Sequence, residues 1–201
     1  GAPLYATKAV DPIIINAGDG AHEHPTQALL DMYSILEKKE SIEGLKVVIL
    51  GDIMHSRVAR SNIYGLTKMG ADVHLAGPRT MVYPELEKLG VTVHHDIREA
   101  VADADVVNVL RIQLERIHSA LYPTNREYAR IFGINSDVLK LAKDDVMVMH
   151  PGPMNRGLEI APDVAYSDQS VIQEQVRNGV AIRMAVLYLT IIGGDGSELA
   201  Y

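Results

Sequence analysis

The chain has 201 residues, 19 lysines and arginines against 26 aspartates and glutamates, and a formal net charge of −7 at pH 7. Its length suffices for a core that needs no disulfide, and the absence of cysteine excludes disulfides, thiolate zinc sites and iron–sulfur clusters. The acidic balance argues against a nucleic-acid-binding surface, so we expect a cytoplasmic protein that acts on a small molecule.

The first 38 residues are expected to form an incomplete unit. A strand-like run covers 13–16, and the apolar spacing predicts a helix from Pro25 to about Lys38. The polar stretch that ends at Gly44 is typical of a helix end and a connection. Because one strand with its flanking helices cannot bury a sheet face, we expect residues 1–38 to be the tail end of a truncated second α/β domain.

Beyond this unit, strand and helix patterns alternate. Strands are predicted at 46–50, 72–76, 91–94, 105–110 and 146–150, and helices at 57–69, 84–89, 97–102 and near 137–142. Near-continuously apolar strands joined by helices predict an α/β fold, a doubly wound parallel sheet with helices on both faces. The apolar run 180–192 contains Arg183 and is too short to span a bilayer, so it is expected to be a buried C-terminal helix. Part of the helix 171–192 is expected to be an apolar surface that a complementary fragment or another subunit must cover.

Polar segments follow three of the predicted strands, at 51–57, 111–113 and 150–153. Ligands of open parallel sheets bind beyond the carboxyl ends of the strands, so these segments should share one rim. Arg57 and Arg111 with Gln113 would form a clamp for a ligand with two carboxylates. Each arginine alone is also compatible with a surface residue or a structural ion pair, and residues 150–153 alone with a plain tight turn.

The stretch HEHPTQALLD, 22–31, combines a helix start with polar side chains. Pro25 fits the first helical turn, which leaves His24 at the N-cap and Gln27 one turn later. Backbone N–H groups and the helix dipole favour an anion or a polarised oxygen there. A metal site at His22, Glu23 and His24 is disfavoured, because the spacing is not His-Glu-x-x-His and no further ligand lies near in the sequence.

Four motifs occur in order: HPTQALLD (24–31), GDIMHSRVARS (51–61), LRIQLER (110–116) and HPGPMNRG (150–157). Together they resemble the catalytic chain of the aspartate carbamoyltransferase family, over about residues 1–192. The resemblance implies carbamoyl transfer from carbamoyl phosphate to L-aspartate in pyrimidine biosynthesis, no metal or other cofactor, and a trimer. It also implies that 1–38 is the C-terminal remnant of a carbamoyl-phosphate-binding domain with its interdomain helix, and 39–201 an aspartate-binding domain whose last helix packs back on the first domain.

The resemblance also implies a role for each matched residue. His24 and Gln27 would be catalytic, with His24 donating to the carbamoyl oxygen and Gln27 holding the carbamoyl nitrogen. Arg57 and Arg111, the latter assisted by Gln113, would bind the two carboxylates of aspartate. The backbone of the loop 151–153 would hold the carbamoyl NH2 and the attacking amine, which assigns Pro151 to carbamoyl phosphate and Gly152 and Pro153 to aspartate.

The sequence departs from the family pattern at two places. Met54 stands where many relatives have lysine, and the Ser-Thr-Arg-Thr-Arg phosphate loop and the serine and lysine lent by a neighbouring subunit do not occur. The ornithine-specific relatives carry His-Cys-Leu-Pro where this chain has HPGP, so aspartate is the expected acceptor.

The first alternative is a non-catalytic amino-acid-binding fragment that needs the missing N-terminal domain, a complementary fragment or another subunit. Regulatory or other pathway subunits are further candidate partners of the complete protein, whereas nucleic acid and membranes are not. The second alternative is a Rossmann-type nucleotide-binding domain. Against it, GDIMHSR lacks G-x-G-x-x-G, and Gly77-Pro78-Arg79 after the second strand offers no acidic residue for a ribose.

Overall fold

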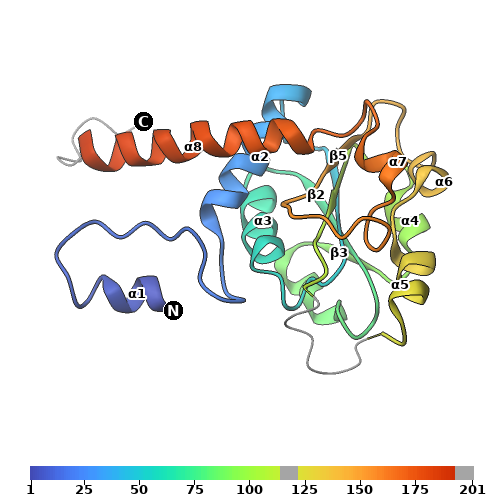
Figure 1. The fold of residues 1–201 in the computed structure, drawn as a ribbon, viewed down its shortest axis with the longest axis horizontal. Coiled ribbons are helices and arrows are strands. Elements are labelled where there is room, and N and C mark those ends of the chain that lie inside the picture. The colour runs from blue at the N-terminus through green and yellow to red at the C-terminus, as the bar shows by residue number, and fades with distance from the viewer. Residues whose placement is uncertain (114–121, 193–201) are drawn as a thin grey trace.

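The structure is a computed structural model that describes residues 1–113 and 122–192 (Figure 1). Its strands are β1 (Lys46–Leu50), β2 (Asp72–Ala76), β3 (Thr92–His94), β4 (Val106–Val109) and β5 (Met147–Met149). Its α-helices are α1 (Ala2–Ala6), α2 (Pro25–Lys39), α3 (Arg57–Lys68), α4 (Ile97–Val101), α5 (Asn125–Phe132), α6 (Ser136–Leu139), α7 (Pro162–Ala165) and α8 (Ile172–Ile192). A 3₁₀ helix covers Pro84–Leu89.

The strands form one parallel sheet in the order β3-β2-β1-β4-β5. Val47 of β1 pairs with Val73 on one side and with Val106 on the other, which places β1 at the centre. β1 and β4 are buried along nearly their whole lengths, as expected for strands covered on both faces. The predicted parallel α/β sheet is therefore confirmed, with observed strand ends within one residue of the predicted ones.

Helices cover both faces of the sheet, as predicted (Figure 1). On one face, Ile35 of α2 and Ile63 of α3 pack against Val47 and Ile49 of β1. On the other face, Ala100 of α4 and residues of α6 and α7 pack against the alternate side chains of β1 and β4. This alternation follows from the two-residue period of a strand, which sends successive side chains to opposite faces.

Local structure departs from the predictions at a few places. Residues 13–16 form no strand in the described part of the chain, because no neighbouring strand offers backbone partners there. The predicted helix at 84–89 is a 3₁₀ helix, and α1, α5 and α7 were not anticipated. The helix expected near 137–142 lies at Ser136–Leu139, so it begins one residue earlier and ends three residues earlier, and Asn135 caps its first turn.

The C-terminal helix α8 contradicts the prediction that it is buried. Only Gln175, Asn178 and Gly179 of this helix are buried, whereas most apolar side chains of its second half are exposed, Ile191 to 72%. In Figure 1 the first half of α8 lies beside α2 and the second half projects past it. An apolar sequence pattern shows that a helix needs a covering surface, but it does not show which part of the protein supplies that surface. The helix was therefore predicted correctly, whereas its burial within this chain was not. Among the described residues, no helix is long and apolar enough to cross a membrane.

Candidate functional site

A cleft with a volume of about 90 Å³ lies at the carboxyl ends of β1, β4 and β5. It brings together seven of the eight residues selected from the sequence, and it adds two that were not selected. The lining residues are His24, Gln27, Ser56, Arg57, Val58, Arg111, Gln113, Pro151 and Gly152. The eighth selected residue, Pro153, is exposed and does not line the cleft.

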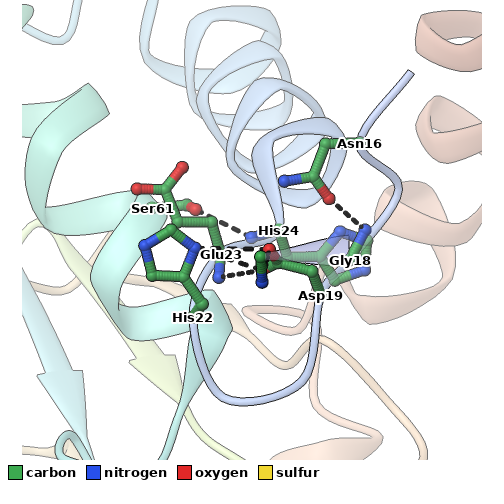
Figure 2. Close-up of polar contacts among 8 residues, drawn as sticks. Asn16, Gly18, Asp19, His22, Glu23, His24 and Ser61 are labelled. Atoms are coloured by element: carbon green, nitrogen blue, oxygen red, sulfur yellow. Dashed lines mark hydrogen bonds and ion pairs between the residues drawn. The ribbon is translucent and has the colours of Figure 1, made fainter. Parts of the chain in front are cut away.

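His24 occupies the N-cap of α2, where Pro25 begins the helix. Its backbone N–H donates to the Ser61 hydroxyl of α3 over 2.9 Å, which fixes the start of α2 against α3 (Figure 2). The imidazole makes no capping hydrogen bond to the helix, and its Nδ1 lies 3.5 Å from the Thr26 hydroxyl. The ring is therefore held at the helix start by the backbone and available to the cleft through its side chain.

The electrostatic surroundings keep the His24 ring neutral at pH 7. Partial burial lowers the pKa of His24 from 6.5 to about 4, with smaller contributions from the positive charges of Arg57 and Arg183. Both effects disfavour a second proton on the imidazole. A neutral imidazole still carries one N–H, so His24 can donate a hydrogen bond to a polarised oxygen without itself being charged.

Gln27 is held from behind by a buried carboxylate. Its Nε2 donates to Asp31 Oδ1 over 3.0 Å, one helical turn further along α2. Asp31 also accepts from the amide of Asn62 on α3 at 2.7 Å and from that of Gln175 on α8 at 2.8 Å. Since the Gln27 NH2 group faces Asp31, its carbonyl oxygen is the atom left for the cleft, where it can accept from an N–H group. Burial raises the pKa of Asp31, and the amide donors oppose this rise.

Arg57 begins α3, directly after the loop that follows β1. Ser56 is the N-cap and accepts from the backbone N–H of Ala59 over 3.1 Å. Asp52 organises the preceding turn by accepting from the backbone N–H of His55. A Cβ atom at Gly18 would lie only 2.5 Å from Arg57 Nη1, so the guanidinium lies directly against the backbone of the loop before α2. Arg57 is thus positioned by a capped helix start.

The segments after β4 and β5 close the other side of the cleft. Gln175 Oε1 accepts from the His150 N–H over 2.9 Å, and the Gly152 N–H donates to His150 Nδ1 over 2.9 Å. Gly152 has φ +66, which favours glycine, and its bond to Pro153 is cis. Asn155 Nδ2 donates to the carbonyl of Ile112, between Arg111 and Gln113, over 2.8 Å. Leu114, Glu115 and Arg116 of the LRIQLER motif lie outside the described residues.

The residues around His22 do not form a metal centre. His22 Nδ1 lies 3.3 Å from Asp19 Oδ2, and the Glu23 N–H donates to the same carboxylate (Figure 2). His24 is bound through its backbone to Ser61 instead. In residues 1–113 and 122–192, no group of three or more His, Cys, Asp or Glu side chains converges as metal ligands would.

Sequence reasoning missed the supporting polar residues, above all Asp31, Asn62, Gln175, Asn155 and Glu159. Only Asp31 carried a local signal, since it interrupts the apolar side of α2. Gln175 lies 144 residues from Asp31 in sequence, and no spacing pattern connects the two.

Comparisons with known proteins agree on one family. Residues 43–190 match "Aspartate/ornithine carbamoyltransferase, Asp/Orn binding domain", and residues 3–37 match the carbamoyl-P binding domain of the same family. The aspartate carbamoyltransferase catalytic subunit of Desulforamulus reducens is 60% identical over 200 residues, covering 100% of this chain and 64% of that protein. That of Ruminiclostridium cellulolyticum is 62% identical over 199 residues, covering 99% and 64%. The chain thus spans about 64% of the length of these relatives.

Solved structures show the same likeness. Ligand-free aspartate transcarbamoylase from Trypanosoma cruzi superposes with a TM-score of 0.79 at 30% identity, covering 93% of this chain and 62% of that one. Ornithine carbamoyltransferase from Pyrococcus furiosus superposes with a TM-score of 0.72 at 36% identity, covering 84% and 56%.

Proposed function

The chain belongs to the aspartate/ornithine carbamoyltransferase family, and we propose that the whole protein transfers a carbamoyl group from carbamoyl phosphate to L-aspartate in pyrimidine biosynthesis. Residues 39–201 supply the aspartate-binding domain, and residues 1–38 the end of the carbamoyl-phosphate-binding domain. The single observation that carries the proposal is the shared cleft, which combines two arginines and a glutamine with the His24 ring. The relatives at 60% and 62% identity bear the aspartate-specific name.

The proposed reaction is a direct displacement. The α-amino nitrogen of aspartate attacks the carbamoyl carbon, a C–N bond forms, and the C–O bond to phosphate breaks. Phosphate leaves with the electron pair and takes up the proton that the amine loses. His24 donates its N–H to the carbamoyl oxygen, where negative charge develops. The Gln27 carbonyl oxygen accepts from the carbamoyl NH2 group, as its hydrogen bond to Asp31 favours.

Acceptor binding in this proposal uses the positive charges of the cleft. Arg57 and Arg111 pair with the two carboxylates of aspartate, with Gln113 assisting Arg111, because guanidinium groups bind planar carboxylates through paired hydrogen bonds. The carbonyls of Pro151 and Gly152 hold the carbamoyl NH2 and the attacking amine. Ornithine places an ammonium where aspartate has its second carboxylate, and two arginines would repel it. Holding both reactants in one orientation supplies much of the acceleration, without a metal or a covalent intermediate.

The complete site also needs parts that this chain does not supply. The exposed apolar surface of the second half of α8 supports packing against the rest of the carbamoyl-phosphate-binding domain, to which α2 belongs. For the whole protein the proposal includes a cytoplasmic homotrimer, as in the family it resembles.

The test is the formation of N-carbamoyl-aspartate at saturating carbamoyl phosphate and L-aspartate, with L-ornithine as the control acceptor. We expect the whole protein to turn over with aspartate and not with ornithine. Carbamoylation of ornithine, or no product in the whole protein, would refute the assignment.

A second candidate function for this chain by itself is amino-acid binding without chemistry. It is favoured by the coverage of 64% of the relatives and by the missing phosphate-loop motif. Succinate, a dicarboxylate that lacks the attacking amine, separates the two. If this chain binds succinate but forms no product from aspartate, it holds the aspartate half-site alone.

A further inference from the structure

A second buried carboxylate, Glu159, lies behind the loops that flank the cleft. Only 1% of its surface is exposed, and three N–H groups point at its two oxygens. Oε1 is 3.1 Å from His150 Nε2 and accepts from the backbone N–H of Asn155 over 2.5 Å. Oε2 accepts from Asn155 Nδ2 over 3.1 Å. These three contacts give both oxygens of the buried side chain a hydrogen-bond partner.

The hydrogen bonds around His150 leave one arrangement of its protons. Nδ1 accepts from the Gly152 N–H over 2.9 Å, so it carries no proton of its own. The remaining nitrogen, Nε2, therefore carries the hydrogen and donates it to Glu159. Glu159 thus selects the tautomer of His150 that can receive the Gly152 N–H, and through it the carboxylate determines the path of the backbone at Gly152.

Asn155 connects the same carboxylate to the other loop. Its Nδ2 group has two hydrogens, of which one goes to Glu159 Oε2 and the other to the Ile112 carbonyl over 2.8 Å. Ile112 lies between Arg111 and Gln113, both of which line the cleft. The segment after β4 and the segment after β5 are therefore fastened to one buried group, although they are about 40 residues apart in sequence.

We infer that Glu159 is a positioning residue for the acceptor half of the cleft: acting through His150 and Asn155, it holds Gly152 and the Arg111–Gln113 segment at the separation that a dicarboxylate needs. The inference rests on the proposed function, since it assumes that these segments bind the acceptor. Glu159 itself does not line the cleft. Its effect is expected in the affinity for the acceptor and in the geometry of the two segments.

The Glu159→Gln variant tests this with almost no change in size. One carboxylate oxygen becomes an NH2 group. In one orientation this group faces His150 Nε2 and the backbone N–H of Asn155, and in the other it faces Asn155 Nδ2. In either orientation at least one hydrogen-bond donor faces another donor. We expect the dissociation constant for succinate, measured by calorimetry on the whole protein, to rise at least tenfold. Asn155→Ala, which removes the connection to Ile112 and leaves the His150–Glu159 bond, should give a smaller rise and guards against misfolding of the first variant.

The matched control is Asp105→Asn. Asp105 is also a buried carboxylate, but it binds Lys46 and Lys143 at the amino ends of the strands, away from the cleft. This variant should lose stability without a change in succinate affinity. Glu159→Gln with wild-type affinity, or Asp105→Asn with an equal loss of affinity, would overturn the positioning role.

Nitrogen-15 NMR keeps this inference separate from the proposed function. In the wild-type protein at pH 7, His150 should have a protonated Nε2 and an unprotonated Nδ1, and Glu159→Gln should shift the amide signals of Ile112 and Gly152 while Asp105→Asn does not. If the whole wild-type protein fails to bind succinate, the proposed acceptor site is wrong, and these signals still decide whether Glu159 fixes the two segments. An Nδ1-protonated His150, or unshifted Ile112 and Gly152 signals, would overturn it.

Discussion

The depressed pKa of His24 makes the stability of this protein depend on pH in a defined window. The pKa falls from 6.5 to about 4 on folding, first through burial and then through Arg57 and Arg183. The unfolded chain therefore binds a proton at His24 near pH 6.5, whereas the folded chain binds it only near pH 4. The free energy of unfolding must rise as the pH increases from 4 to 6.5, and the His24 contribution is constant on either side.

The size of this effect follows from the shift. A change from 6.5 to about 4 corresponds to at most about 3.4 kcal/mol, at ~1.36 kcal/mol for each pKa unit. His24 is only half-buried, so solvent screening reduces this to about 1–2 kcal/mol. Between pH 7 and pH 4 the wild-type chain should thus lose about 1–2 kcal/mol more stability than His24→Gln, which has no titrating ring.

Urea unfolding at several pH values, in buffers free of phosphate and carboxylate ions, measures this difference. A direct check is the NMR titration of the His24 ring, where Arg57→Gln should raise the pKa partway toward 6.5, since burial remains. Parallel stability curves for wild type and His24→Gln, or an unchanged titration in Arg57→Gln, would refute the electrostatic description of this site.

Three further predictions concern affinity, packing and association. Arg111→Ala should weaken succinate binding by about 10- to 100-fold, from the loss of a charged hydrogen-bonding partner, as calorimetry would measure; an unchanged affinity would contradict its assignment. Gly77→Ala should cost about 1–3 kcal/mol in urea unfolding, because its Cβ would lie 2.5 Å from the backbone oxygen of Gly51, whereas wild-type stability would mean that this backbone contact relaxes. Leu187 and Ile191 are 50% and 72% exposed, and replacing both with glutamate should reduce self-association of this chain with little change in stability. Sedimentation experiments would measure the association, and an unaltered association would exclude α8 as the contact surface.

The sequence was most informative where local chemistry and the geometry of parallel sheets act together. The β1 and β4 strands could be predicted because Val47–Leu50 is continuously apolar and Val106–Val109 is apolar at three of its four positions, a pattern typical of short strands covered on both faces. Strand direction then predicted that the segments after β1, β4 and β5 would meet, and they line one cleft. Their functional roles remain a proposal.

Other features depend on partners that a local pattern does not identify. The strand predicted at 13–16 has suitable side chains but no neighbouring strand. Helix α8 is apolar around its circumference, so its composition predicted burial, whereas the residues that are buried are Gln175, Asn178 and Gly179, which meet α2 and the loop after β5. In α8 the buried side chains are polar and most apolar ones are exposed, which is the reverse of the usual distribution.

This reversal has a physical explanation in the two buried carboxylates. Asp31 and Glu159 accept from amide, imidazole and backbone N–H groups in defined directions, so each acts as a directional anchor. When the NH2 group of a side-chain amide donates to a carboxylate, the position of the amide oxygen is also fixed. In Gln175 that oxygen accepts from the backbone N–H of His150. Orientation is thereby passed from Asp31 through Gln175 to the loop that Glu159 holds from its other end. The loop is thus held at both ends by groups that do not line the cleft. The lining residues are therefore free to serve ligand binding, while their positions depend on residues that the sequence alone did not single out.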